Sequence, residues 1–283
     1  MKIKKSVYKF KEVYRKLTVP QFTIVTGLIV IFFGTLLLSS PLCSSSNVGL
    51  WEAFFTSTSA ITVTGLTIID VGIDLNIFGQ ICLSFMLLSG GLGLMAITTF
   101  LQGFVVKGTQ LRTRLDKGKT LDEFGVGGIG RTFRSIAITA TSIISFGAIV
   151  LYFFGFLEIQ NNWERLWSSI FHSISAYNNA GFSLWSNSLQ DYRSNFVVNI
   201  VFIFLIVMGG LGWRVIDDIW SNRKNLSYKK LSLHSRLVIR TSFSLIIFGS
   251  LGFFVIETLL NSQFFSDLNF FEKILSSIFE TVS

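Results

Sequence analysis

Ser59-Ala60-Ile61-Thr62-Val63-Thr64-Gly65-Leu66 and Ser175-Ala176-Tyr177-Asn178-Asn179-Ala180-Gly181-Phe182 share the pattern S-A-x-x-x-[T/A]-G-[L/F]. Each stretch lies between two hydrophobic segments of membrane length. A short polar turn with a glycine at such a place can turn its backbone carbonyls toward a water-filled axis, where they replace the hydration shell of an ion. The two stretches therefore predict a membrane fold organised around a repeated turn.

The composition is that of a membrane protein. Of the 283 residues, 50% are hydrophobic and 14% charged, and the mean hydropathy is +0.60, whereas soluble domains average about 25% charged residues. A helix needs roughly 20 apolar residues to cross the hydrocarbon core. Five segments are long enough: Val19–Leu38, Phe78–Val105, Ile136–Phe156, Phe196–Val215 and Leu237–Leu260. We therefore predict an all-α integral membrane protein with five transmembrane helices.

The distribution of basic residues predicts the orientation of the chain. The net charge is +8, and 21 of the 24 Lys and Arg residues lie in the N-terminal tail and around the second and fourth connections. The other connections hold only Arg165, Arg193 and Lys273. Because Lys and Arg accumulate on the cytoplasmic side, this pattern predicts a multi-pass protein of the plasma membrane with its N-terminus in the cytoplasm. It argues against a nucleic-acid partner.

The connections on the opposite side repeat a second pattern. Segments Trp51–Thr58, Trp163–Ile174 and Phe271–Ser283 each open with an aromatic residue followed by Glu, and the last two share S-S-I-F at Ser168–Phe171 and Ser276–Phe279. A Glu in the first turn of a helix interacts favourably with the helix dipole. The segments are too short to span, so we predict re-entrant pore helices that enter the membrane ahead of each turn. Irregular backbone at that depth must be buried in protein or line a water-filled cavity.

The chain is thus a repeat of span, pore helix, filter turn and span, with two complete units and an interrupted third. The predicted division is residues 1–18 as a cytoplasmic basic N-terminus, 19–106 as the first pore repeat, 107–131 as a cytoplasmic linker, 132–220 as the second pore repeat, 221–236 as a second cytoplasmic linker and 237–283 as the incomplete third repeat.

The span after each turn carries the same glycine motif. Leu88–Gly93 and Val207–Gly212 both end in G-G-L-G, which supplies Gly90, Gly91, Gly93, Gly209, Gly210 and Gly212. Glycines allow transmembrane helices to approach closely. They also suit a flexible point in a pore-lining helix. The sequence leaves both roles, packing and hinge, open.

The turns offer backbone chemistry rather than acids or bases. Around Thr62 and Thr64 the ligands are carbonyl oxygens and two hydroxyls, and Gly65 and Gly181 suit a positive φ. Oxygen ligands without carboxylates fit a monovalent cation better than Ca²⁺ or Mg²⁺, which recruit Asp or Glu. No span carries a nucleophile–base pair or a cluster of metal ligands, so we expect no enzyme, no covalent cofactor and no metal beyond a monovalent ion.

Three other side chains carry weaker signals. Cys43 and Cys82 predict neither a disulfide framework nor a metal site. His172 occupies a position where the other units have Thr56 and Glu280. Such variation of residue type favours a packing or polar-contact role over a pH sensor.

These motifs resemble the ion-translocating subunits of the Trk/Ktr/HKT superfamily of potassium transporters. The resemblance rests on T-S-A-I-T-V-T-G-L, F-H-S-I-S-A-Y-N-N-A-G-F-S-L, both G-G-L-G helices, the entry Leu17–Gln21 and Gly34–Leu38. It covers essentially the whole chain, and the short N-terminus is more similar to the KtrB branch. The resemblance implies four repeats around one pore, with Gly65 and Gly181 as filter glycines. It also implies that Val63, Thr64, Asn179 and Ala180 contribute carbonyls to K⁺, with Thr62 and Asn178 as filter support.

The resemblance further implies partners and a substrate. Members are commonly dimers that assemble on a cytosolic nucleotide-binding subunit of the KtrA or TrkA type, so a nucleotide is expected only on that partner. The implied substrate is K⁺. Selectivity for K⁺ over Na⁺ and stimulation by Na⁺ stay open.

The end of the chain departs from the family pattern. Ser283 aligns with Ser175, so the sequence stops before a third filter glycine. We therefore expect a C-terminally truncated subunit that does not move K⁺ by itself and needs a further part to complete the pore. The alternative is a non-conducting membrane subunit or remnant.

Overall fold

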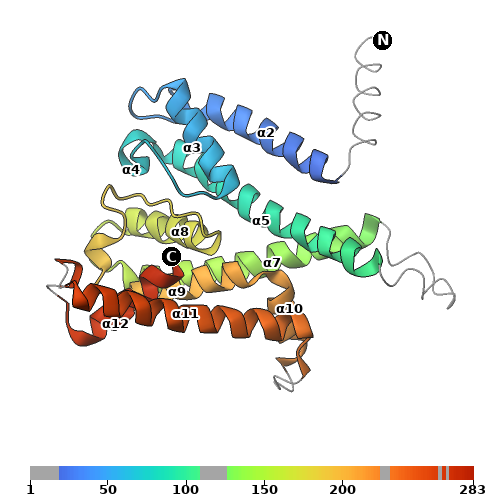
Figure 1. The fold of residues 1–283 in the computed structure, drawn as a ribbon. Coiled ribbons are helices and arrows are strands. Elements are labelled where there is room, and N and C mark those ends of the chain that lie inside the picture. The colour runs from blue at the N-terminus through green and yellow to red at the C-terminus, as the bar shows by residue number, and fades with distance from the viewer. Residues whose placement is uncertain (1–18, 109–125, 224–229, 261–262, 266–267) are drawn as a thin grey trace, which may run out of the picture.

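The computed structural model of the chain consists of helices joined by short connections (Figure 1). It describes the chain except for residues 1–18, 109–125, 224–229, 261–262 and 266–267. Within the described residues, β pairing is limited to an isolated antiparallel bridge between Ser44 and Leu75. The predicted all-α class is therefore confirmed. The predicted basic N-terminus, most of the first linker and part of the second lie outside the described residues.

The described residues of the first part of the fold form four helices: α2 (Val19–Leu38), α3 (Leu50–Thr62), α4 (Val71–Asp74) and α5 (Ile77–Gly108). The short helix α3 packs against both α2 and α5. Its start is fixed by Glu52, whose carboxylate accepts a hydrogen bond of 2.8 Å from the Gly49 N–H. This contact satisfies one of the backbone donors that every helix start leaves unpaired.

The second part has the same order of long helix, short helix, turn and helix. It consists of α7 (Val126–Val150), its π-helical extension η3 (Leu151–Gly155), α8 (Asn162–Tyr177), the 3₁₀ turn η4 (Gln190–Tyr192), α9 (Phe196–Leu211) and α10 (Trp213–Ser221). Helix α8 packs between α7 and α9, as α3 packs between α2 and α5.

The last part contains α11 (Leu233–Leu259), the 3₁₀ turn η7 (Gln263–Phe265) and α12 (Phe270–Val282). The α12 start repeats the α3 start, because Glu272 accepts a 2.8 Å hydrogen bond from the Asn269 N–H. Helix α12 contacts α9, which joins this part to the second one.

Helix length and hydropathy identify the candidate spans. Among the described residues, Arg134–Gly155 and Leu233–Leu259 are long and apolar enough to cross a membrane, and Phe196–Leu211 with Trp213–Ser221 is a third candidate, bent by 96°. The described apolar stretches of α2 and α5, Ile24–Leu38 and Ile77–Gly93, are shorter. The predicted fourth span, Phe196–Val215, is wrong at its end: the helix stops at Leu211 and changes direction.

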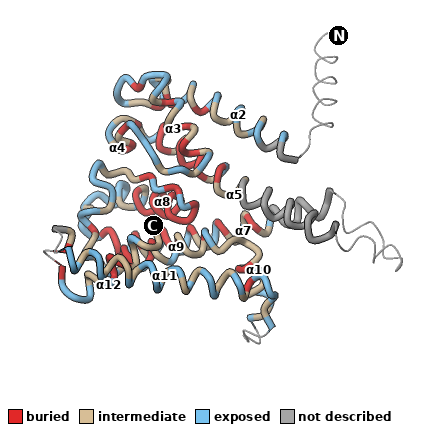
Figure 2. The backbone as a smooth tube through the Cα atoms, viewed as in Figure 1, coloured by how far each residue is buried: buried red, intermediate tan, exposed pale blue. Residues whose placement is uncertain are grey.

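Burial is concentrated on the short helices. Nine of the 16 residues of α8 are buried, and Figure 2 shows buried backbone gathered on α3 and α8. Large apolar side chains are exposed on the outer helices, as at Phe32 of α2 and Phe248 of α11. Helix α8 is therefore enclosed and apolar side chains cover the outer helices, whereas the turns keep exposed residues such as Thr64 and Asn179.

Candidate functional site

The two S-A-x-x-x-[T/A]-G stretches adopt the same backbone conformation. Val63 and Asn179, at equivalent positions, both have a φ of 55°, and the glycines two residues later, Gly65 and Gly181, have φ of 84° and 71°. Gly adopts positive φ freely, but the left-handed conformation costs an L-residue roughly 1–2 kcal/mol. Val63 is β-branched and thus a marked exception, of the kind that surrounding structure must hold in place.

The same pair of hydrogen bonds ends each short helix. The Thr64 N–H donates to the Ser59 carbonyl at 2.9 Å, and the Ala180 N–H donates to the Ser175 carbonyl at 2.9 Å. The second bond of each pair runs from Val63 N–H to the Ala60 carbonyl (3.4 Å) and from Asn179 N–H to the Ala176 carbonyl (3.0 Å). This is the Schellman arrangement, which turns the chain sharply at a helix end. The Ser-Ala pair of the motif therefore marks the last turn of a helix.

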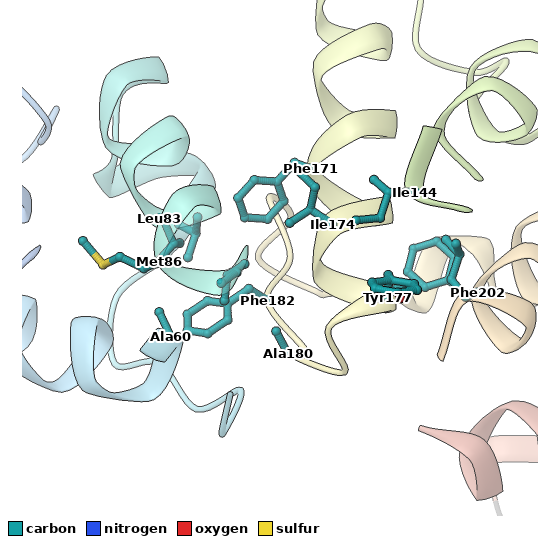
Figure 3. Packing of buried hydrophobic residues seen from close by; sticks show 14 of the residues in the cluster. Ala60, Leu83, Met86, Ile144, Phe171, Ile174, Tyr177, Ala180, Phe182 and Phe202 are labelled. Carbon is teal, nitrogen blue, oxygen red and sulfur yellow. The ribbon is translucent and has the colours of Figure 1, made fainter. Parts of the chain in front are cut away.

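The two turns lie against each other. A Cβ added at Gly65 would lie 2.6 Å from the Ala180 carbonyl oxygen and 3.5 Å from the Gly181 Cα. The residue after the second turn, Phe182, is buried, and Figure 3 shows its ring beside Ala60 of α3. Glycine at position 65 is thus required twice, by its positive φ and by the neighbouring backbone.

A cavity of about 1290 Å³ opens at this meeting point. Its wall includes Thr64, Gly65, Asn179, Ala180 and Gly181, which are five of the six residues predicted to contribute carbonyls. Val63 is not among the lining residues. Other lining residues come from α9, α11 and α12, with Ile206, Ser242 and Thr281 as examples. Residues from the first, second and last parts of the fold therefore line one cavity together with the two turns.

The two predicted support residues hold the turns through their side chains. The Thr62 hydroxyl donates to the Thr58 carbonyl at 2.8 Å and lies 2.6 Å from the Thr64 hydroxyl. The Asn178 side chain is buried and donates to the Ile174 carbonyl at 2.8 Å. Both side chains thus bond back to the helix that precedes their turn.

The first glycine of each G-G-L-G motif permits contact with a turn. A Cβ at Gly90 would lie 2.4 Å from the Ile61 carbonyl oxygen, and one at Gly209 would lie 1.8 Å from the Tyr177 carbonyl oxygen. Ile61 and Tyr177 occupy equivalent positions in the two motifs. A Cβ at Gly91 would lie 1.9 Å from the Asn178 Oδ1, while one at Gly210 would meet only the Asn179 Nδ2, at 3.4 Å. Close packing therefore accounts for Gly90, Gly91 and Gly209.

The last glycine of the motif behaves differently. A Cβ at Gly93 or Gly212 would meet no described atom within 4 Å. Gly93 lies inside the continuous helix α5, whereas Gly212 has a φ of 82° and separates α9 from α10 at the 96° bend. The break after α9 is thus located at the one G-G-L-G glycine that has a positive φ.

The family profile described as "TrkH: Cation transport protein" matches residues 5–283 of the chain. The chain belongs to the TrkH family. It is 32% identical over 269 residues to "Ktr system potassium uptake protein B" of Bacillus subtilis, covering 95% of this chain and 59% of that protein. It is 31% identical over 276 residues to "Potassium/sodium uptake protein NtpJ" of Enterococcus hirae, covering 96% of this chain and 60% of that protein. The chain thus spans about three fifths of the length of these relatives.

The solved structure of the potassium transporter TrkH from Vibrio parahaemolyticus has a similar fold. The TM-score is 0.57 at 19% sequence identity, and the match covers 91% of this chain and 49% of that one. The resemblance seen in the sequence motifs is therefore confirmed, and so is a multi-pass protein embedded in a membrane. Membership of a cation transport family also agrees with the prediction that the chain is not an enzyme.

The sequence analysis missed a pair of amide side chains at the start of α5 and an equivalent pair at the start of α9. Asn76 donates through Nδ2 to the Leu42 carbonyl at 2.8 Å, and Asn195 donates through Nδ2 to the Gly155 carbonyl at 3.3 Å. Both amides thus reach back to the end of the preceding long helix or its connection. The signal was available as Asn-x-x-x-[Gln/Asn] at 76–80 and 195–199.

The second amide of each pair is buried and fixes neighbouring backbone. Gln80 donates to the Leu75 carbonyl at 3.0 Å, and its Oε1 accepts a 2.6 Å hydrogen bond from Trp167 Nε1 of α8. Asn199 donates to the Tyr192 carbonyl at 3.0 Å and the Asn195 carbonyl at 2.8 Å. Gln80 therefore links the first part of the fold to the second by a part-buried hydrogen bond, whose loss would leave the polar group of buried Gln80 without this partner.

His172 joins α8 to the segment after the second turn. Its ring is buried and stacks on Trp185, with centroids 4.1 Å apart. The Leu184 N–H donates to Nε2 at 3.3 Å, and Nδ1 lies 2.8 Å from the Ser168 carbonyl. Since Nε2 accepts, Nδ1 carries the proton and the ring is neutral. The predicted packing and polar-contact role fits these partners.

Proposed function

We propose that the chain forms part of the K⁺-conducting pathway of a Ktr/Trk-type potassium uptake subunit. The observation that carries this proposal is the contact between two identically shaped turns at the wall of one cavity. Family membership supports a cation as the substrate. The names of the relatives, one a potassium uptake protein and the other a potassium/sodium uptake protein, support K⁺.

The proposed ligands are backbone carbonyls of Val63, Thr64, Gly65, Asn179, Ala180 and Gly181. Carbonyl rings replace the hydration shell of a passing ion. Helices α3 and α8 act as pore helices, because each ends directly before a turn and the C-terminal end of a helix carries about half a negative charge. Among the described residues, no group of three or more His, Cys, Asp and Glu side chains could hold a metal ion, so the proposed selectivity depends on these carbonyls.

The proposal includes the predicted membrane arrangement and partners. In this proposal the chain has five spans, and its pore helices are α3, α8 and α12. The N-terminus faces the cytoplasm, which the 21 basic residues on alternate connections support. The subunit forms a homodimer and is regulated by a cytosolic nucleotide-binding partner of the KtrA or TrkA type. Its basic linkers supply part of that contact.

Uptake measurements test the proposal. Cells without their own K⁺ uptake would express the chain alone, or joined to the part of the Bacillus subtilis relative that the match leaves uncovered. We expect the joined form to restore growth at low K⁺, and Gly65→Ser to weaken the rescue and raise Na⁺ entry. Gly252→Ala, a change in α11 with no described atom within 4 Å of the new methyl group, is the control. Failure of the joined form to carry either ion, despite its presence in the membrane, would contradict the proposed function.

A further inference from the structure

The two cysteines of the chain lie in contact, although the sequence alone predicts no pairing. The Sγ atoms of Cys43 and Cys82 are 3.9 Å apart. Cys43 lies in the connection between α2 and α3, and Cys82 lies in the second turn of α5. Thirty-nine positions separate them in the sequence, so their meeting is a property of the fold.

The connection that carries Cys43 is held by backbone contacts at the start of α5. The Asn76 N–H donates to the Cys43 carbonyl at 3.1 Å, and the Asn76 side chain donates to the Leu42 carbonyl at 2.8 Å. Ser45 N–H donates to the Asp74 carbonyl at 2.8 Å. These bonds on both sides of Cys43 fix where its side chain emerges.

Helix α5 is shaped to receive this connection. A Cβ added at Gly79 would lie 2.1 Å from the Cys43 carbonyl oxygen, so the absence of a side chain at Gly79 lets the two backbones touch. Cys82 lies three residues further along, on the same face of the helix. The close approach at Gly79 therefore places Cys82 opposite Cys43.

We propose that Cys43 and Cys82 are a dithiol site that forms an intramolecular disulfide with an external low-molecular-weight disulfide as oxidant. A disulfide requires Sγ atoms about 2.05 Å apart, so the two sulfurs must approach by about 1.9 Å from their separation of 3.9 Å. Cys82 is only partly buried and Cys43 is buried, which makes Cys82 the point of entry. In the proposed topology Cys43 lies in an outer connection and Cys82 lies at the outer end of the span that follows it, on the side of the membrane where disulfides persist.

The exchange balances in two steps. The Cys82 thiolate attacks the external disulfide, forming a mixed disulfide and releasing one external thiolate. The Cys43 thiolate then attacks the Cys82 sulfur, forming the Cys43–Cys82 bond and releasing the second external thiolate. The protein loses two electrons and two protons, and the external disulfide is reduced to two thiols.

The bond would close a covalent loop around the first turn. Residues 43–82 contain α3, the Thr62–Leu66 turn and α4. Oxidation would therefore fix both ends of the segment that positions Gly65. That consequence rests on the proposed function, whereas formation of the bond does not.

An aromatic disulfide whose reduced form is coloured, 5,5′-dithiobis(2-nitrobenzoate), tests the site on the folded, detergent-solubilised chain. A reactive pair releases two coloured thiolates per chain and retains no adduct, and the protein mass falls by two hydrogen atoms. Peptide mapping then finds Cys43 joined to Cys82. Cys43→Ser is the matched control: it should release a single thiolate and keep the adduct on Cys82.

Three results would overturn the proposal, and none depends on ion transport. The first is an adduct retained on either cysteine of the unsubstituted chain after complete reaction. The second is a disulfide between two chains in place of the internal one. The third is no reaction in the folded chain when both thiols react after unfolding. The number of thiolates released and the mass of the protein do not depend on whether the chain carries K⁺. Failure of the disulfide site and failure of the proposed function are therefore distinguishable.

Discussion

Replacing Gly209 by Ala should separate α9 from the second turn, because the new methyl group has no room. The Cβ would lie 1.8 Å from the Tyr177 carbonyl oxygen and 2.8 Å from the carbonyl carbon. Real Cβ atoms essentially never come within 3.0 Å of such a neighbour, so the two backbones must part by at least about 1.2 Å. The obstacle is a backbone carbonyl at the end of α8, which cannot rotate away as a flexible side chain would.

The expected cost follows from two opposing effects. A Gly→Ala change inside a helix ordinarily stabilises by roughly 0.5–1 kcal/mol, whereas overpacking a well-packed site costs about 1–3 kcal/mol. A rigid obstacle favours the upper end of that range, so we expect a net loss of about 2 kcal/mol at Gly209. At roughly 2–4 °C per kcal/mol for a domain of this size, the apparent melting temperature should fall by about 4–8 °C.

The assay is thermal unfolding of the detergent-solubilised chain, followed as the fraction that still elutes as a single species after heating. Gly252→Ala in α11 is the matched control, since its new Cβ meets no described atom within 4 Å. It should leave the melting temperature unchanged or raise it slightly. Equal melting temperatures for Gly209→Ala and Gly252→Ala would refute the close contact between α9 and the end of α8, and with it the argument that Gly209 is there to admit that contact.

Three further substitutions test the contacts around the turns. Gly65→Ala places a side chain at a φ of 84°, a conformation that costs an L-residue roughly 1–2 kcal/mol. The ratio of K⁺ uptake to Na⁺ uptake by the joined form should therefore fall. An unchanged ratio would argue against a filter position for Gly65. Gln80→Leu removes the 2.6 Å acceptor of the Trp167 indole and should cost about 1–3 kcal/mol in thermal unfolding. Adding Trp167→Phe should recover part of that loss, and a purely additive double variant would contradict a direct contact. His172→Phe keeps an aromatic ring but leaves the Leu184 N–H without its acceptor, so hydrogen exchange at that amide should accelerate roughly threefold to tenfold, and unchanged protection would rule out the bond.

Local chemistry is the part of this fold that the sequence predicts well. The helix over Val19–Leu38 has the predicted bounds, because a run of apolar residues and its polar flanks are local signals. The turn after α3 was also foreseeable, since Gly65 is suited to positive φ. The positive φ of Val63 was not, because nothing in a β-branched residue indicates it.

Contacts between distant segments carried no comparable signal. Gln80 and Trp167 are 87 positions apart, and neither belongs to the motifs that organise the repeat. The 3.9 Å contact of Cys43 with Cys82 likewise depends on where a connection is pressed against α5. Pairing of this kind is fixed by the relative placement of two backbones, which periodicity and composition do not describe. Equivalent positions in the two stretches predicted similar turns, but not that Gly65 would lie against the second turn.

The break after α9 coincides with a difference in sequence between the two units, which the G-G-L-G motif alone does not show. Beyond the first motif the chain continues with Leu94-Met95-Ala96-Ile97, which is apolar, and α5 stays helical to Gly108. Beyond the second it continues with Trp213-Arg214 and reaches Asp217-Asp218. A straight continuation of α9 would carry Arg214, Asp217 and Asp218 to about 27–33 Å from its start, at a rise of 1.5 Å per residue. That distance is the far edge of a hydrocarbon core of about 30 Å.

The positive φ of Gly212 instead redirects the chain through 96°. The redirected segment is α10, where Asp218 accepts a 2.9 Å hydrogen bond from the Ser232 N–H at the start of α11. Hydrogen bonds from Ser235 and Ser232 hold the pKa of the Asp218 carboxyl below its usual range, as expected of a carboxylate with donors around it. The glycine makes the bend possible, and the charged residues that follow it belong to α10 rather than to a continued α9. The same four-letter motif therefore yields a continuous helix in one unit and a bent pair in the other.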